Sequence, residues 1–400
     1  MALTTASLAS DPVTADRTVA RAYLDHASSS PLRPAALDAM LPYLRTHAAD
    51  PGRLHSEGRT TRVALETARE QVSELFGARP REVVFTATGT ESINAAIWGA
   101  VERGLELGDR NRAHVVTTAV EHSSVLDACR RAPVELTEIG VDGAGRVGAD
   151  AVLDALRDDT VLVSVQLANH EVGTIQGALA AVIAGAAARG VVVHVDACAA
   201  AGHVPLDFGA LGADLCSITA HKLGGPKGAG ALLVRRGLRI PPFVVGGMQE
   251  RARRGGIEDV PALVGFGAAA AELSAGDRLS IEAARARSQS ERISAAALAV
   301  EGVERFGDAD ACLPHLVCLG VGGVEAEPIL LALDQRGVAV HSGSSCSSEA
   351  LEPSPVLQAM GVDADKSLRV SVGWSTTDAD VDAFVVAFPD VVARLRALRT

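Results

Sequence analysis

The chain carries a carboxylate and a lysine at positions that are not typical of a solvated surface. Asp196 follows the apolar run Val-Val-Val-His-Val, and Lys222 follows Ser-Ile-Thr-Ala-His and precedes a glycine-rich turn. A carboxylate at the end of a buried strand needs a cationic or hydrogen-bonding partner, although a helix N-cap or a structural ion pair would also explain it. Burial would make the lysine an imine-forming nucleophile. Lys227 in the same turn is equally suitable by type, and the sequence alone does not choose between the two.

A turn of small residues follows another apolar run. Residues 86–92 read Thr-Ala-Thr-Gly-Thr-Glu-Ser and come directly after Glu-Val-Val-Phe. If this turn opens a helix, the unpaired N–H groups around Gly89 and Thr90 form an anion site, strengthened by the helix dipole. Ordinary N-capping by a serine or threonine is the simpler alternative.

Two further residues could take part in chemistry. His122 follows Glu121 after a predicted strand, although a lone histidine is more often structural than catalytic. Cys346 lies among small polar residues at 342–348, which is not a core environment, so we expect an exposed thiol that can act as a nucleophile. An incidental free thiol is the alternative. Together, an anion cradle, a buried acid and a lysine suit pyridoxal 5′-phosphate, which needs partners for its phosphate, its pyridine nitrogen and its aldehyde.

The elements that position these residues are predicted from the hydrophobic pattern. We expect strands at residues 82–87, 114–119, 161–167, 191–195, 215–219 and 231–234, with helices between them that include residues 62–76 and 177–189. Short continuous apolar runs are typical of parallel strands buried on both faces. Their alternation with helices predicts a doubly wound α/β domain, in which ligands collect at the carboxyl ends of the strands.

The pattern changes after about residue 267. Residues 268–299 predict one or two long helices, shorter strands follow at 315–319, 338–341 and 368–372, and Thr377 is a good N-cap for a last helix with a kink at Pro389. We therefore predict a large domain of residues 34–267, a smaller α+β domain of residues 21–33 and 268–400, and a flexible tail at residues 1–20.

Composition excludes several classes of function. The formal net charge of −12 opposes nucleic acid and anionic membranes as general partners. No apolar run approaches the roughly 18 residues that span a bilayer, and residues 1–20 do not read as a signal peptide. The six cysteines are scattered without metal-like spacing, so we expect no metal site and no disulfide framework, and we read Cys198 and Cys216 as core residues. A cytoplasmic protein is the resulting prediction.

The same segments resemble a known family. The chain is similar from about residue 23 to about residue 398 to the class V, fold type I, pyridoxal-phosphate enzymes, and within them to the NifS-like cysteine desulfurases. The segments that carry the resemblance are residues 23–27 (Tyr-Leu-Asp-His-Ala), 90–92 (Thr-Glu-Ser), 121–127 (Glu-His-Ser-Ser-Val-Leu-Asp), 194–197 (His-Val-Asp-Ala), 220–222 (Ala-His-Lys), 225–228 (Gly-Pro-Lys-Gly), 342–348 (Ser-Gly-Ser-Ser-Cys-Ser-Ser) and 351–354 (Leu-Glu-Pro-Ser).

The resemblance implies a role for each candidate residue. The cofactor would be held by Gly89, Thr90, Thr219 and His221 at its phosphate, Asp196 at its ring nitrogen, His170 at its 3′ oxygen and Lys222 at its aldehyde. His122 would stack on the ring and move protons, and Arg369 would bind the substrate carboxylate. Cys346 would take the sulfur of L-cysteine as a persulfide, leave L-alanine, and pass the sulfur to an acceptor protein from an extended mobile loop. A homodimer is implied as well.

The chain departs from the family pattern at several positions. His170 replaces an asparagine, Ala199 replaces a glutamine, and residues 255–257 read Gly-Gly-Ile where the family has Ser-Gly-Thr, whose threonine reaches the partner subunit's phosphate. Asp50 also replaces an asparagine. These changes put rate, specificity and cofactor affinity in question more than the class of reaction.

Two other functions stay open. A selenocysteine lyase or cysteine lyase of the same class would not need Cys346, so its removal would leave turnover intact. A sulfur-delivery scaffold would turn over poorly without its partner, and Arg251, Arg253 and Arg254 could dock an acidic partner, although a solvated loop also explains them. The sequence does not name the acceptor.

Overall fold

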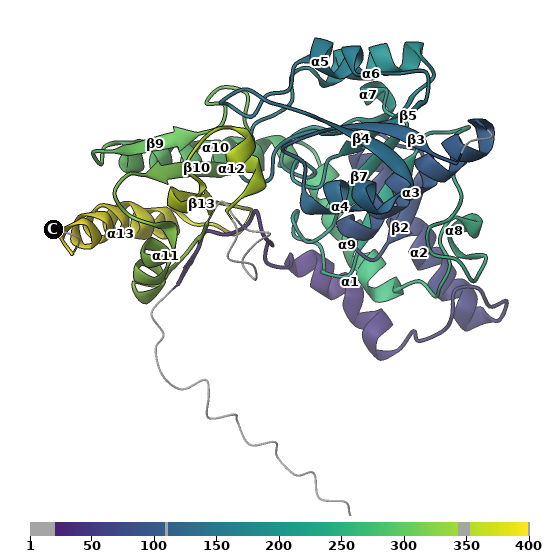
Figure 1. The fold of residues 1–400 in the computed structure, drawn as a ribbon. Helices are drawn as coiled ribbons and strands as arrows, with labels where there is room; N and C mark the ends of the chain where they lie inside the picture. The colour runs from purple at the N-terminus through teal and green to yellow at the C-terminus, as the bar shows by residue number, and fades with distance from the viewer. Residues whose placement is uncertain (1–20, 109–110, 343–352, 399–400) are drawn as a thin grey trace, which may run out of the picture.

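The computed structural model describes residues 21–108, 111–342 and 353–398. The predicted tail at residues 1–20 and Cys346 lie outside the described residues. Figure 1 shows a larger part around one sheet, a smaller part around a second sheet, and the two joined along the chain near α1 and α10. No helix in the described ranges is long and apolar enough to cross a membrane.

The larger part is built on a seven-stranded sheet in the order β2-β8-β7-β6-β5-β3-β4. All neighbouring pairs are parallel except those of β8, which is antiparallel to both β2 and β7. The predicted α/β fold with a mainly parallel sheet is therefore confirmed. The strands are β2 (Val83–Thr86), β3 (Ala113–Thr118), β4 (Val134–Ile139), β5 (Thr160–Gln166), β6 (Val192–Asp196), β7 (Leu215–Thr219) and β8 (Gly230–Val234).

Within this sheet, only β4 was missed by the hydrophobic pattern. Its sequence Val-Glu-Leu-Thr-Glu-Ile alternates apolar and polar residues, and most of its side chains are at least partly exposed. It is the edge strand beside β3, and of its residues only Ile139 is buried, whereas β2 at the opposite edge is buried throughout. Short continuous apolar runs mark central strands, and this edge strand has none. In the smaller part, the short strands at residues 22–23 and 303–306 were missed as well.

Helices cover both faces of the sheet because successive strand residues point to opposite sides. In β6, Val193 and Val195 enter one hydrophobic core, whereas Val192 enters the other. The first core is closed by α2 (Ser56–Leu75), α6 (Leu179–Ala188) and α9 (Val260–Ser274), with contributions from α1 (Pro34–Arg45), α5 (Ala149–Asp154) and α7 (Phe208–Leu211). The second core is closed by α3 (Gly89–Gly108) and α4 (Ser123–Arg131).

The smaller part has its own sheet and core. The antiparallel strands β12 (His341–Ser342), β13 (Ser367–Ser371), β10 (Leu316–Val321) and β9 (Val303–Phe306) lie side by side in that order, and β1 (Ala22–Tyr23) pairs with β11 (Val338–Ala339). Its helices are α10 (Arg278–Leu298), α11 (Ala326–Gln335), α12 (Pro355–Ala359), the 3₁₀ turn Ala364–Lys366, and α13 (Asp378–Ala397), which contains Pro389.

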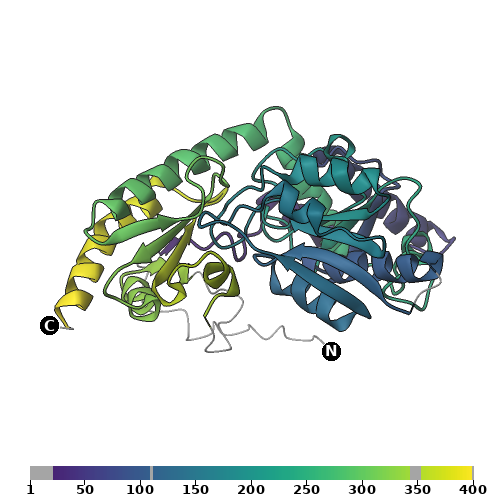
Figure 2. The same cartoon turned by 45° about the horizontal axis from the view of Figure 1, so that its top comes forward.

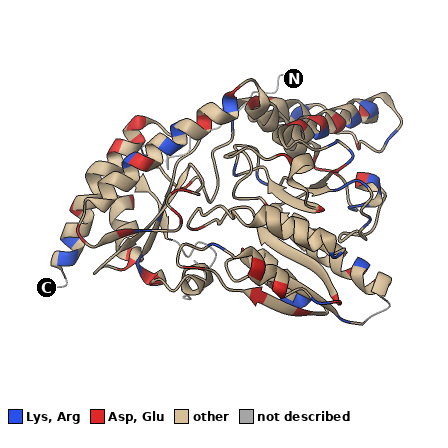
Figure 3. Ribbon diagram, turned by 90° about the horizontal axis from the view of Figure 1, so that it is seen from above, with Lys and Arg blue, Asp and Glu red and all other residues tan. Residues whose placement is uncertain are grey.

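The ends of these helices follow from local sequence. Thr377 caps α13 as predicted, in a capping box with Asp380. Figure 2 shows α10 running beside α13, where Arg292 pairs with Asp378 and Asp382. Basic and acidic residues are interspersed along such helices (Figure 3), as in the i,i+4 pair Arg278–Glu282.

The predicted boundary at residue 267 falls inside α9, whose Leu273 still packs in the first core of the larger part. The sequence suggested this position because alanine-rich helix begins there, but composition does not reveal which core a helix face joins. We propose that the two domains meet between Ser274 and Arg278, and that residues 21–33 belong with the smaller one, where Ala22 and Leu24 are buried.

The short turn α8 (Gln249–Ala252) has left-handed backbone at three consecutive non-glycine residues, with φ of 48° at Glu250, 59° at Arg251 and 62° at Ala252. A buried ion pair holds it in place. The Glu250 carboxylate accepts hydrogen bonds from Arg69 at 2.6 and 2.7 Å and from the Phe85 N–H at 2.9 Å. Such backbone persists only where its surroundings enforce it, and here it fixes the path of residues 253–257.

Ala252→Gly is expected to raise the free energy of unfolding by roughly 1 kcal/mol. Left-handed backbone costs an L-residue roughly 1–2 kcal/mol, and glycine's larger entropy in the unfolded chain offsets part of that gain. Urea unfolding measures the change. The matched control is Ala295→Gly on the exposed face of α10, which should lose about 1 kcal/mol. Destabilisation of similar size at both positions would contradict a left-handed Ala252.

Candidate active site

One cavity of about 340 Å³ lies at the carboxyl ends of the central strands, within the size range of small-molecule sites. Asp196 ends β6, Thr219 ends β7, and Gln166 ends β5, so three neighbouring strands deliver polar residues to one edge. Every site residue predicted from the sequence lines this cavity except Cys346, which lies outside the described residues: Gly89, Thr90, His122, His170, Asp196, Thr219, His221, Lys222 and Arg369.

The first turn of α3 forms one wall of the cavity. A Cβ atom on Gly89 would lie 2.7 Å from the Cys198 sulfur and 3.2 Å from Thr219 Cβ, so only glycine allows this close approach. Thr88 and Thr90 line the cavity beside it. Because the first N–H groups of a helix have no partner within the helix, this turn can bind an anion.

Two side chains on β7 and its following turn lie across from that helix end. Thr219 Oγ1 is 2.9 Å from His221 Nδ1. Burial, then the charges of Lys222 and Lys227, lower the pKa of His221 to about 4, so its ring is neutral at neutral pH. A hydroxyl and an imidazole N–H at a helix N-terminus are a donor set suited to a phosphate.

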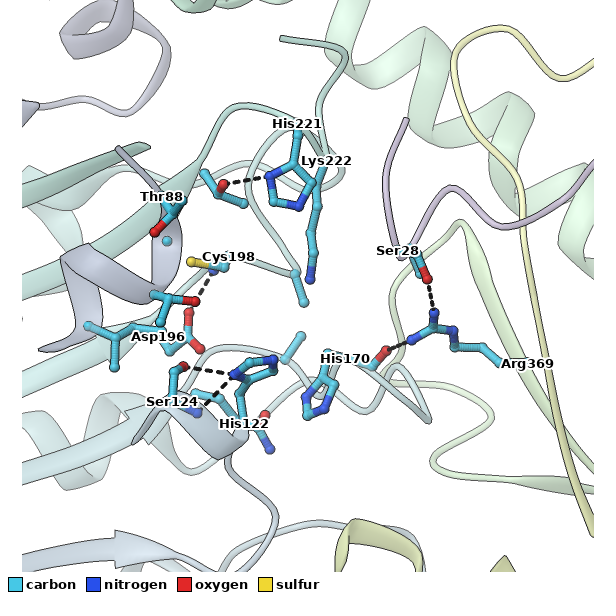
Figure 4. Close-up of a pocket in the computed structure, with 18 residues that line it drawn as sticks. Ser28, Thr88, His122, Ser124, His170, Asp196, Cys198, His221, Lys222 and Arg369 are labelled. Carbon is cyan, nitrogen blue, oxygen red and sulfur yellow. Dashed lines mark hydrogen bonds between the residues drawn. The ribbon is translucent and has the colours of Figure 1, made fainter. Parts of the chain in front are cut away.

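Asp196 and Lys222 both reach the cavity, as Figure 4 shows. Asp196 is buried, and its Oδ1 accepts the Cys198 N–H at 2.9 Å. Two hydrogen bonds hold the Lys222 main chain in place. Its carbonyl accepts them from Ser30 Oγ at 3.0 Å and from His203 Nε2 at 3.2 Å. An acid and a lysine on opposite sides of one cavity fit the ring nitrogen and the aldehyde of pyridoxal phosphate.

The alternative lysine takes no part in this cavity. Lys227 is exposed and lines a separate hollow with Tyr23, Ser29 and Met40. The structure thus separates two lysines that residue type left equivalent, and the one in the cavity is Lys222, to which the family resemblance assigns the aldehyde.

Two neutral histidines form the floor of the site. The rings of His122 and His170 meet edge to face with centroids 5.0 Å apart. Burial is the main cause that lowers the pKa of each to about 3, and the positive charge of Lys222 acts in the same direction. The Ser124 N–H donates to His122 Nδ1 at 3.1 Å, so the proton of the neutral ring is assigned to Nε2.

The residue before His122 ties two strand ends together. Glu121 accepts hydrogen bonds from Thr118 Oγ1 at 2.6 Å and from the Gln166 N–H at 3.0 Å. Burial raises the pKa of Glu121 to about 8. Glu121 is therefore mostly protonated at neutral pH and links β3 to β5 through these two hydrogen bonds. This link helps to position the next residue, His122, which is the N-cap of α4.

Arg369 comes to the cavity from the second sheet. It is buried in β13 and donates to the His170 carbonyl at 3.0 Å, to Ser28 Oγ at 2.6 Å and to Asp25 Oδ1 at 3.2 Å. These contacts hold the guanidinium in one orientation at the junction of the two sheets (Figure 4). A fixed planar fork of donors suits a carboxylate.

The sequence did not point to several residues that line the cavity, namely Ser28, Ser124, Gln166 and Cys198. Cys198 and Cys216 are both buried as predicted, but Cys198 also faces the site. Its position two residues after Asp196 could have indicated this, as could the polar Gln166 at the end of an apolar strand. Ala199 lines the cavity as well and offers no hydrogen bond there.

Comparison with known proteins agrees with this arrangement. Residues 22–384 match the class V aminotransferase family. A cysteine desulfurase, IscS 1 of Archaeoglobus fulgidus, is 39% identical over 384 residues, which cover 94% of this chain and 98% of the relative. The solved structure of a NifS-like protein superposes with a TM-score of 0.86 at 28% identity, covering 94% of this chain and 100% of that one. A structure of SspA in complex with cysteine gives a TM-score of 0.77 at 28% identity over 88% of this chain and 98% of that one.

The match extends over nearly the whole chain, and the residues that the family resemblance singled out meet in one cavity apart from Cys346. The chain therefore belongs to the class V aminotransferase family and, within it, to the NifS-like cysteine desulfurases.

Proposed function

We propose that this protein is a pyridoxal-phosphate-dependent cysteine desulfurase that converts L-cysteine to L-alanine and takes up the sulfur as a persulfide on Cys346. The observation that carries the proposal is the meeting of Lys222, Asp196 and the first turn of α3 around one cavity that also contains Arg369. The SspA structure with bound cysteine supports L-cysteine as the substrate.

The residues present fit the cofactor. Gly89, Thr90, Thr219 and His221 would hold its phosphate, Asp196 its ring nitrogen, His170 its 3′ oxygen and Lys222 its aldehyde. Pyridoxal phosphate, when bound, supplies an electron sink for negative charge on the substrate carbon. The close approach at Gly89 is the strongest support for the phosphate position, because a side chain there would fill the cradle.

The chain's own groups then bind the substrate and move protons. Arg369 would pair with the substrate carboxylate, since its guanidinium is already oriented by Asp25, Ser28 and the His170 carbonyl. His122 would exchange protons through Nε2, because its Nδ1 accepts the Ser124 N–H. Burial is the main cause that lowers the pKa of His122 to about 3, so the ring is uncharged at neutral pH.

Cys346 would perform the sulfur transfer. Its thiolate attacks the substrate sulfur, an S–S bond forms as the substrate Cβ–S bond breaks, and the carbon keeps the electron pair and is protonated to the methyl group of alanine. L-cysteine and the Cys346 thiol thus give L-alanine and a Cys346 persulfide, without an outside oxidant or reductant.

The described residues on either side of Cys346 support this role. His341 in β12 pairs with Arg369 in β13, and Ser354 Oγ donates to Glu171 Oε2 at 2.5 Å, next to His170. The segment that bears Cys346 therefore starts and ends beside cavity residues. Cys346 lies four positions after Ser342, a length of chain that spans up to roughly 14 Å.

We also propose that the protein acts in the cytoplasm as a homodimer and passes its sulfur to an acceptor protein. Large apolar side chains are exposed on the outer turns near α2 and α8, namely Leu54, Val63, Val245, Met248 and Ile257, and a second copy would cover them. The five described cysteines are free thiols, consistent with a reducing compartment.

The test of the proposed function uses the purified protein. We expect visible absorbance from lysine-linked pyridoxal phosphate, and equal amounts of alanine and sulfide from L-cysteine in the presence of a thiol reductant. A protein that takes up no pyridoxal phosphate, or releases no alanine with any acceptor or reductant, would contradict it.

A further inference from the structure

The loop after the left-handed turn contacts the first turn of α3. Arg254 Nε lies 2.8 Å from Glu91 Oε1, and Arg254 Nη2 lies 3.1 Å from Glu91 Oε2. Both side chains are largely buried, with 22% of Arg254 and 14% of Glu91 exposed. A bidentate pair with this little exposure is held in one geometry, unlike a typical surface salt bridge.

Glu91 is held in the first turn of α3, next in sequence to the residues that line the cavity. Its Oε2 accepts the Ala87 N–H at 3.0 Å, and its own N–H donates to Thr88 Oγ1 at 3.0 Å. The residues between, Thr88, Gly89 and Thr90, line the cavity. A carboxylate in the first turn stabilises a helix by itself, but it repels a second anion bound at the same helix end.

A phosphate ester carries between one and a half and two negative charges at neutral pH, by the same ionisation that applies to phosphorylated side chains. We infer that Arg254 is a positioning residue for the cofactor phosphate: its guanidinium neutralises Glu91, so the N-terminus of α3 keeps its attraction for a dianion. The hydrogen bond to Glu91 raises the pKa of Arg254, so the Arg254 guanidinium stays charged. The inference rests on the proposed function.

The residues that follow Arg254 in the loop offer no substitute for this charge. The three residues after Arg254 are Gly255, Gly256 and Ile257, which have no side-chain hydrogen-bond donor. The path of the loop is set by the Arg69–Glu250 pair behind the left-handed turn, so Arg254 reaches Glu91 from a fixed backbone. The neighbouring Arg253 donates to the Glu250 and Val83 carbonyls, both at 3.3 Å, and not to Glu91. Neutralisation of Glu91 in the described part of the loop therefore depends on Arg254.

The test is a double-mutant cycle on the holoenzyme with Arg254→Met, Glu91→Gln and the double variant. The readouts are the rate of pyridoxal phosphate release on dilution and the ³¹P chemical shift of the bound phosphate. We expect Arg254→Met to release the cofactor about tenfold faster, which corresponds to about 1.4 kcal/mol. Glu91→Gln should bind at least as tightly as wild type, because its amide oxygen can still accept the Ala87 N–H.

The double variant distinguishes two roles for Arg254: neutralising the charge of Glu91, or only anchoring the loop to α3. Recovery to within about threefold of wild type, together with a conserved ³¹P shift, is the result that neutralisation predicts. If Arg254 only fastened the loop, Glu91→Gln would weaken binding as much as Arg254→Met and the double variant would not recover. Arg254→Lys, which keeps the charge, is the control that should stay near wild type, and melting temperatures verify that each variant is folded.

The outcomes also separate this inference from the proposed function. A wild-type protein that takes up no pyridoxal phosphate overturns both. A wild type that binds the cofactor, with an Arg254→Met variant that holds it equally well, overturns only the role of Arg254.

Discussion

Lys222→Ala is expected to abolish turnover of L-cysteine, with a loss of more than about 10³-fold in kcat. The variant should also lose the visible absorbance of the lysine-linked cofactor, because no amine remains at this position of the cavity. Pyridoxal phosphate would then be held only by non-covalent contacts at Asp196 and the first turn of α3, so it should wash out on gel filtration. Alanine release and absorbance spectra of the purified variant measure both effects.

Lys227→Ala is the matched control. The two lysines lie five positions apart in one turn, but only Lys222 lines the cavity, whereas Lys227 is exposed elsewhere. Lys227→Ala should therefore keep the absorbance and nearly full activity. A colourless Lys227 variant beside a coloured, active Lys222 variant would reverse the assignment.

Cys346→Ala is expected to keep the cofactor and its absorbance but lose more than about 10²-fold of alanine formation from L-cysteine. The physical reason is that sulfur abstraction needs a thiolate, which alanine cannot supply. Mass spectrometry of the wild type after a single turnover should find one added sulfur on the peptide that contains Cys346. Ser347→Ala, a change of similar size one position away, should behave as wild type.

The outcome for Cys346 also decides between the open alternatives. Full turnover of L-cysteine or selenocysteine by Cys346→Ala would favour a lyase that releases the chalcogen directly. A wild type that carries the cofactor, but produces alanine only when an acceptor protein is added, would favour the sulfur-delivery scaffold.

Two of the departures from the family pattern, His170 and Ala199, line the cavity. His170 differs from an amide donor because its ring meets the His122 ring edge to face, with centroids 5.0 Å apart. Ala199 adds no hydrogen bond to the cavity. Cofactor binding should therefore depend more heavily on the α3 end, where Gly89 and the Arg254–Glu91 pair lie.

The sequence by itself determined the features that local physics controls. Apolar runs buried on both faces identified the central strands, and polar residues at their ends located Asp196, Thr219 and the turn before α3. Thr377 predicted the start of α13, where it forms a capping box with Asp380. Each signal arises from residues within a few positions of one another, because hydrophobic periodicity and helix capping act over one or two turns of chain.

Only the tertiary structure decided which of these residues share a cavity. The choice of Lys222 over Lys227 depends on how the turn after β7 is fastened by Ser30 and His203, which are distant in sequence. Arg369 reaches the site from β13 of the second sheet, where it donates to the His170 carbonyl of the larger part. Arg254 meets Glu91 because the buried Arg69–Glu250 pair holds the turn that precedes Arg254. No single stretch of sequence carries these contacts, since they arise from the order of the strands and the packing of two cores, and both are fixed only when the whole chain has folded.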